Sequence, residues 1–404
     1  MLSQNRFDLL CLALVLVSVC MYPTGTSLGA AITPTPTPNS VTMGHEDFTV
    51  KFDDFTTKAQ LTYPTNNKGP FATVILLHSF GLGDMDNHVL GDPNDSPTFL
   101  QIAQYLAQRG IAVVRFNEHY INSINDKYPT QLATLTVMRL SADADAVYQQ
   151  VVKNRKVDPK RILFWGWGES SPIAAYLASQ HKEIAGLILQ SPVIGTLKDN
   201  FYAMYNLFGL PYIRQYVDAD HDGKISAAEA ASVFSQQNTH DNARQWVSYL
   251  MDFVISNGKI SSSLKSTIDT NHDSFLDIEQ EIEPYFRKEF EHFYDETDQF
   301  NPFGFLVYRS SAQFPLLIDS VKTVQQPILI VQGGNDALVP AQNAKYVDNI
   351  LTSIDNADHT MLLFPGLGHS LSLVYSIFED KFGSVEPEAL DGIDMWINSH
   401  FGNS

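Results

Sequence analysis

Short apolar segments alternate with amphipathic ones along most of this chain, and this alternation limits its fold more than any other feature. Residues 74–77, 111–116 and 162–165 have the length and composition of buried strands. Between the last two, residues 137–152 place apolar side chains three and four positions apart, as an amphipathic helix does. Because strands separated by helices usually pair in parallel, the sequence predicts an α/β fold, with a doubly wound, mostly parallel sheet between helices.

One long interval breaks this alternation. Residues 196–315 are rich in acidic and aromatic side chains and are predicted to be mainly helical. The interval is too long for a simple connection, so we expect it to be an inserted subdomain. The predicted organisation is a targeting segment at 1–31, a Thr/Pro-rich linker at 32–47, a core in two parts at 48–195 and 316–404, and a helical insertion at 196–315.

The N-terminus has the pattern of an export signal. Arg6 precedes an apolar run at residues 9–21, which has the length of a signal-peptide core and is short for a membrane span. Asp8 weakens the positive end, so an uncleaved membrane anchor stays open as an alternative. Both cysteines, Cys11 and Cys20, lie in this segment, and a mature chain would contain no disulfide. We therefore expect a secreted protein, or one on the extracellular face of the membrane.

The charge of the chain excludes one class of partner. The formal net charge is -19 and the isoelectric point is about 4.9. Such a surface repels phosphate backbones, so we expect no nucleic-acid binding and no membrane contact except through an uncleaved N-terminal segment. The remaining partners are a small-molecule or peptide substrate and another extracellular protein.

Four polar loops follow four predicted strands, at the sheet edge where open α/β sheets bind ligands. Their sequences are His78-Ser79-Phe80-Gly81, Gly166-Trp167-Gly168-Glu169-Ser170, Gly333-Gly334-Asn335-Asp336 and Pro365-Gly366-Leu367-Gly368-His369. This order resembles the α/β-hydrolase family, particularly its dienelactone-hydrolase and prolyl-oligopeptidase-like branches, over roughly residues 48–195 and 315–402.

The resemblance implies a role for each loop. Asp336 would orient the imidazole of His369, and His369 would act as the general base. The backbone N–H groups of Phe80 and Glu169 would form the oxyanion hole. The nucleophile position falls on Gly168, which has no hydroxyl, so covalent catalysis is expected to be impaired or lost. A shifted frame makes Ser170 or Ser171 the nucleophile, but it needs two extra residues in the preceding strand.

The predicted insertion contains a twelve-residue loop with the pattern of an EF-hand, at residues 218–229. The side chains of Asp218, Asp220, Asp222 and Glu229 and the carbonyl of Lys224 would bind Ca²⁺, with a water held by Ser226. Gly223 permits the sharp turn, and Ile225 is the apolar residue that pairs with a partner loop in EF-hands. We expect the ion to stabilise the insertion.

A second, less complete loop lies at residues 269–280. Asp269, Asn271, Asp273, Phe275 and Asp277 occupy ligand positions, with Phe275 offering its carbonyl. Ser274 replaces the glycine and Gln280 replaces the glutamate at position 12, so Glu279 or Glu281 would have to supply the missing carboxylate. Although the two loops start 51 residues apart (269 minus 218), Ile225 and Leu276 are able to meet across a short two-strand contact.

These features favour an exported calcium-binding protein of α/β-hydrolase fold whose serine-hydrolase activity is impaired or lost. The alternative is an active calcium-dependent hydrolase of ester, lactone or peptide bonds that uses Ser170. A third hypothesis treats the loops as a calcium-controlled docking module for another extracellular protein.

Overall fold

The computed structural model describes residues 43–78, 83–88, 96–123, 130–235, 255–256, 259–260, 267–292 and 306–402. The predicted targeting segment at 1–31 and the linker up to residue 42 lie outside the described residues. Within the described ranges, no helix has the length and hydrophobicity that crossing a bilayer requires. All of them belong to one unit, Ser40–Ser404.

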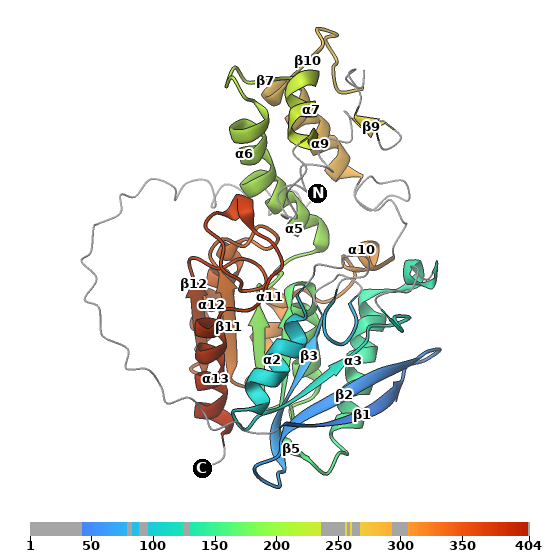
Figure 1. Cartoon of the computed structure of the whole chain (residues 1–404), viewed down its shortest axis with the longest axis vertical. Helices are drawn as coiled ribbons and strands as arrows, with labels where there is room; N and C mark the ends of the chain where they lie inside the picture. Colours follow the sequence, from blue (N-terminus) through green and yellow to red (C-terminus); the bar gives the residue numbers. More distant parts are fainter. Residues whose placement is uncertain are drawn as a thin grey trace, which may run out of the picture. The chain divides into compact units, whose positions relative to one another are not determined.

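An eight-stranded sheet forms the centre of this unit, in the order β1-β2-β4-β3-β5-β6-β11-β12 (Figure 1). The first three strands in this order pair antiparallel, and every later pairing is parallel, as the alternation of strands and helices predicted. The strands are β1 Met43–Lys51, β2 Thr56–Pro64, β3 Phe71–Leu77, β4 Ala112–Phe116, β5 Val157–Trp167, β6 Gly186–Gln190, β11 Ile328–Gly333 and β12 His359–Phe364.

Successive strand residues point to opposite sides of the sheet, and both sides carry apolar side chains. Helices therefore cover both faces. In β3, Ile75 and Leu77 pack into one hydrophobic cluster with α3, α4, α11 and α12, while Val74 and Leu76 pack into another with α2 and α13. These helices are α2 Thr98–Ala107, α3 Val137–Val151, α4 Ser171–Gln180, α11 Leu317–Ser320, α12 Ala341–Ser353 and α13 Pro387–Phe401.

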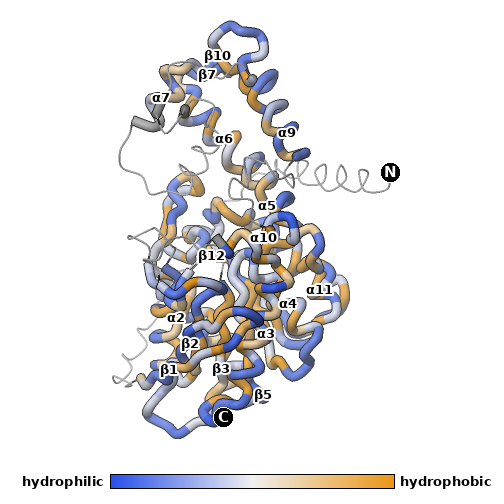
Figure 2. Tube along the Cα trace, turned by 90° about the vertical axis from the view of Figure 1, so that its right-hand side faces the viewer, coloured by the Kyte–Doolittle hydropathy of each residue, from blue (hydrophilic) through white to orange (hydrophobic). Residues whose placement is uncertain are grey.

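Between β6 and β11 the described residues are mainly helical. Residues 197–217 form one helix with π-helical turns at Tyr205–Gly209 and Ile213–Val217. Figure 2 shows hydrophobic and hydrophilic residues mixed along α6 and α9, and their apolar side chains join one cluster. The elements here are α5 Leu197–Met204, α6 Leu210–Tyr212, β7 Lys224–Ser226, α7 Ala227–Ser235, β8 Ile255–Ser256, β9 Lys259–Ile260, β10 Phe275–Asp277, α9 Glu283–Glu291 and α10 Leu306–Ser310.

Candidate active site and metal-binding loops

Gly168 lies at a sharp turn where strand β5 ends and helix α4 is about to begin. The strand ends at Trp167, and the 3-10 turn Gly168–Ser170 leads directly into the helix. Gly168 has a φ of 58°, in the left-handed region that side chains rarely adopt. A Cβ on Gly166 would lie 2.7 Å from the carbonyl oxygen of Ser170, so the turn needs a glycine there. Both features belong to a nucleophile elbow with Gly168 at its tip, which is the unshifted frame.

His369 and Asp336 meet at the same edge of the sheet, from the loops after β12 and β11. The His369 Nδ1 atom lies 3.0 Å from Asp336 Oδ2 and 3.1 Å from Oδ1. Asp336 also accepts hydrogen bonds from the Gln332 side chain and from the backbone N–H groups of Leu338 and Val339. Both His369 and Asp336 are buried. These contacts fix the carboxylate and the orientation of the imidazole.

The imidazole is also held against the elbow. The ring of His369 stacks on Trp167, with their centroids 5.2 Å apart, and Trp167 directly precedes Gly168. The Trp167 Nε1–H donates to the His369 carbonyl oxygen at 3.2 Å. Burial alone would lower the pKa of His369, but the Asp336 carboxylate outweighs it and the pKa is raised. His369 Nε2 has no hydrogen bond to any described residue, so this nitrogen is available as a base.

The sequence comparison agrees with this geometry. Residues 73–374 match the model of a family described as having the alpha/beta hydrolase fold. The chain belongs to the alpha/beta-hydrolase fold family. No curated protein sequence is similar enough to count as a match.

The solved structures that are similar to the chain share little sequence identity with it. An esterase from Pyrococcus furiosus shares 13% identity, with a TM-score of 0.49, over 92% of this chain and 96% of its own. An acylaminoacyl peptidase from Pyrococcus horikoshii shares 10%, with a TM-score of 0.48, over 90% of this chain and 42% of its own.

Neither serine near the elbow is placed as a nucleophile of this alpha/beta-hydrolase fold protein. Ser170 is 4% exposed, and its hydroxyl oxygen lies 3.0 Å from the carbonyl oxygens of both Leu77 and Trp167, the two acceptors within reach of its single O–H. The same hydroxyl accepts the Trp167 backbone N–H at 2.9 Å. Ser171 is fully buried and donates to the Gly166 carbonyl oxygen at 3.2 Å. Among the described residues, neither hydroxyl bonds to His369.

Replacing Ser170 with alanine should therefore lower stability. The change leaves the buried Trp167 N–H without its serine acceptor, which costs about 1–3 kcal/mol of unfolding free energy. Denaturant unfolding of both proteins in calcium measures the loss. Ser179→Ala, near the half-buried C-terminal end of the following helix α4, is the control and should cost less. A neutral Ser170→Ala would show that the hydroxyl is not held as described.

Of the two residues predicted to form the oxyanion hole, only Glu169 lies among the described residues. Phe80 lies outside the described residues. Glu169 directly follows Gly168 in the elbow turn, where the family's second donor lies, and its side chain lines a small cavity beside the turn. The roles of both backbone N–H groups stay predictions.

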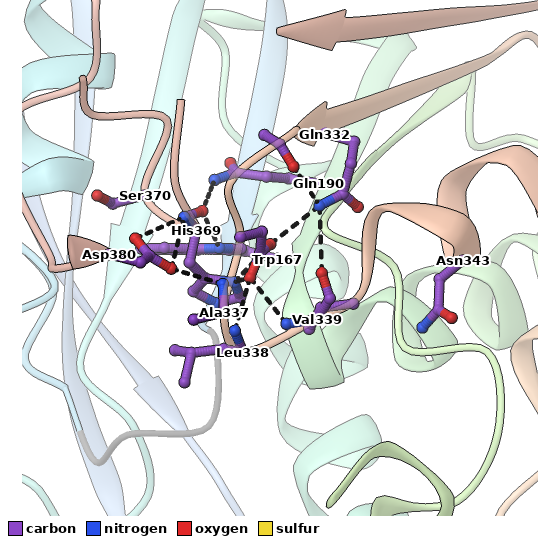
Figure 3. A network of polar contacts seen from close by, with 12 residues as sticks. Trp167, Gln190, Gln332, Ala337, Leu338, Val339, Asn343, His369, Ser370 and Asp380 are labelled. Carbon is purple, nitrogen blue, oxygen red and sulfur yellow. Dashed lines mark hydrogen bonds and ion pairs between the residues drawn. The ribbon is translucent and has the colours of Figure 1, made fainter. Parts of the chain in front are cut away.

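Two buried acids were missed by the sequence analysis. Asp380 accepts the backbone N–H of Ala337 at 2.8 Å and that of His369 at 3.1 Å, and so joins the two loops (Figure 3). Burial, helped by the nearby Asp336 charge, raises the pKa of Asp380 to about 7. Glu118 lines the cavity beside the elbow. No sequence motif marks Asp380. Glu118, in contrast, comes just after β4, at the sheet edge where open α/β sheets bind ligands, and this position could have indicated a site residue.

The loop at residues 218–229 has a donor set that fits calcium. One carboxylate oxygen from each of Asp218, Asp220 and Asp222 lies within 4.8 Å of the others. Gly223 has a φ of 84°, as the sharp turn requires. Glu229 folds back and accepts the backbone N–H groups of Ala219 and Ser226, the loop's second and ninth residues. Several hard carboxylate oxygens thus converge on one point, which is the ligand chemistry that Ca²⁺ prefers.

The loop that starts at Asp269 repeats this backbone. Asp273 and Ser274 donate their N–H groups to Asp269, as Asp222 and Gly223 do to Asp218. Ser274 has a φ of 69° and takes the conformation of the missing glycine. The two loops are joined by antiparallel pairing of β7 with β10, in which Ile225 lies opposite Leu276. The contact expected between these two apolar residues is therefore present.

The second loop differs from the first by one inserted residue. Glu281 accepts the backbone N–H groups of Thr270 and Asp277, the counterparts of Ala219 and Ser226 in the first loop. It lies 52 residues after Glu229 (281 minus 229), although the loop starts are 51 apart. The π-helical turn Ile278–Ile282 absorbs the extra residue. Glu281 thus occupies the place of Glu229, while Gln280, at position 12, and Glu279 do not.

Proposed function

We propose that this chain is an exported calcium-binding protein of alpha/beta-hydrolase fold whose serine-hydrolase activity is lost or strongly impaired. The observation that carries the proposal is Gly168 at the tip of the elbow, with a φ of 58°, beside a paired His369 and Asp336. An elbow without a hydroxyl forms no acyl-enzyme. The base and its acid partner remain, so the space beside the elbow serves binding rather than acyl transfer.

The calcium part of the proposal rests on two loops of matching backbone. In the first loop Asp218, Asp220, Asp222 and Glu229 supply side-chain oxygens, the Lys224 carbonyl is a further ligand and Ser226 holds a water. In the second loop the corresponding ligands are Asp269, Asn271, Asp273, the Phe275 carbonyl, Asp277 and Glu281. Bound Ca²⁺ neutralises clustered carboxylates and stabilises the segment between β6 and β11. Secretion, or attachment to the extracellular face of the membrane, is proposed from the N-terminal sequence alone.

The alternative, an active hydrolase that uses Ser170, has less support. The Ser170 hydroxyl is buried and forms hydrogen bonds with main-chain groups of Leu77 and Trp167. A nucleophile needs its base within hydrogen-bond reach, and Ser170 has no such contact with His369.

Hydrolysis of p-nitrophenyl esters in millimolar Ca²⁺ tests the loss of activity. The wild type should hydrolyse them no faster than a His369→Ala variant, because neither protein has an activated nucleophile. Chelator-treated wild type is the control for calcium dependence. Saturable hydrolysis that vanishes in Ser170→Ala, with folding intact, would favour the alternative.

A further inference from the structure

A small cavity lies beside the elbow. Its volume is about 50 Å³, and its walls are largely apolar, with contributions from Leu140, Ile173, Val193, Val307 and Phe314. The carboxyl-bearing side chains of Glu118 and Glu169 also line it, together with His78 and Ser170. None of the roles that the family resemblance implies falls on Glu118.

Glu118 is a buried acid that accepts a hydrogen bond on only one of its two carboxyl oxygens from the described residues. The side chain follows strand β4 and is 8% exposed. Its Oε2 atom accepts the Gly83 backbone N–H at 2.7 Å, whereas Oε1 has no hydrogen bond to any described residue. Burial raises the pKa of Glu118, although the charge of His78 and the Gly83 N–H lower it in part. Because buried acids are almost always paired, Oε1 is placed to accept a hydrogen bond from a ligand in the cavity that Glu118 lines.

The chemistry of the cavity selects among ligands. Two carboxyl groups repel a bound carboxylate, and the net charge of -19 adds to that repulsion. An ammonium group supplies N–H donors and a charge opposite to that of the two acids, which gives stronger hydrogen bonds than a neutral alcohol does. At about 10–15 Å³ for each water-sized position, the cavity holds roughly three to five such positions. That room suits a chain of three or four carbons.

We propose that this cavity binds a short primary alkylamine, with its ammonium group hydrogen-bonded to Glu118 Oε1 and its chain between the apolar walls. This inference rests on the proposed function, because it treats the space beside the elbow as a binding site. Glu169, in the lining of the same cavity, contributes negative charge, and Glu118 makes the direct contact.

Isothermal titration of n-butylamine into the calcium-loaded wild type tests the proposal, with n-butanol and butyrate as matched ligands. Butylamine should bind at least about tenfold more tightly than butanol, the difference expected for a charged hydrogen bond, and butyrate should not bind. Glu118→Gln keeps the shape of the side chain and should weaken butylamine at least about tenfold. Glu169→Gln should weaken it less. Val193→Leu narrows the cavity without changing its charge and should also weaken butylamine.

Equal binding of butylamine and butanol would overturn the proposal, and so would unchanged butylamine affinity in Glu118→Gln or no butylamine binding by folded wild type. If Glu118→Gln does not fold, the ligand series on the wild type and on Val193→Leu decides. Failure of the proposed function has a different signature, since wild-type esterase activity would overturn it without changing the order of the three ligands.

Discussion

Replacing Gly168 with serine should make the protein react with a fluorophosphonate probe, which modifies activated serine hydroxyls. The new hydroxyl would stand at the elbow tip, next to the Trp167 ring on which His369 stacks. A serine at a φ of 58° is strained by about 1–3 kcal/mol, which a folded core of this size tolerates. Labelling should be at least about 100-fold faster than in a Gly168→Ser, His369→Ala double variant, the contribution expected of a general base.

The pH dependence of this labelling adds a second readout. His369 must be neutral to accept the serine proton, and its pKa is raised above the ordinary value of 6.5. The labelling rate should therefore rise with pH, through a midpoint above 6.5. A folded Gly168→Ser variant that stays unlabelled at every pH would contradict the placement of the imidazole at the elbow.

Replacing Glu281 with glutamine should remove one of two calcium sites. Glutamine keeps the size of the side chain but loses the charge and one strong acceptor oxygen, and a bidentate carboxylate at this position is a main ligand of such loops. At 1 mM Ca²⁺, a site with a Kd near 10⁻⁴ M stabilises the folded protein by about 1.4 kcal/mol. Calorimetric titration should show two bound ions in the wild type and one in the variant, with a lower Tm in calcium.

The neighbouring Gln280 provides a matched control. It occupies position 12 by sequence count, but Glu281 makes the contacts that Glu229 makes in the first loop. Gln280→Ala should therefore retain both ions, whereas Glu229→Gln should lose the first. Loss of a site in Gln280→Ala, with Glu281→Gln unaffected, would show that the π-helical turn does not set the register of the loop. An unchanged Tm after chelation of the wild type would contradict calcium binding by either loop.

The sequence predicted those features that local patterns encode. Apolar runs of strand length and a helical repeat at 137–152 were sufficient for the parallel sheet, since burial on both faces requires such runs. Gly168, Asp336 and His369 were found because each follows a strand in a family order. The contact between Ile225 and Leu276 was predicted for a similar reason, because both residues occupy the same position of a recognisable loop.

Other parts of the site depend on contacts between distant segments and have no local signal. Asp380 accepts N–H groups from residues 11 and 43 positions away, and no pattern around residue 380 indicates this. Glu118 lines a cavity together with residues of α3, α4 and α10, which come from distant parts of the sequence. Glu279 and Glu281 were both candidates for the last carboxylate of the second loop, because a count along the sequence assumes a regular α-helix. The π-helical turn moves the ligand by one residue, to Glu281.

The central claim is that no serine of the wild type is activated at the elbow. Intact-mass analysis of wild-type protein, incubated with a fluorophosphonate probe in millimolar Ca²⁺, measures this directly, and Gly168→Ser serves as the positive control. The account predicts an unmodified wild-type mass beside a modified variant. A single stoichiometric adduct on the folded wild type, mapped by peptide sequencing to Ser170 or Ser171, would contradict it.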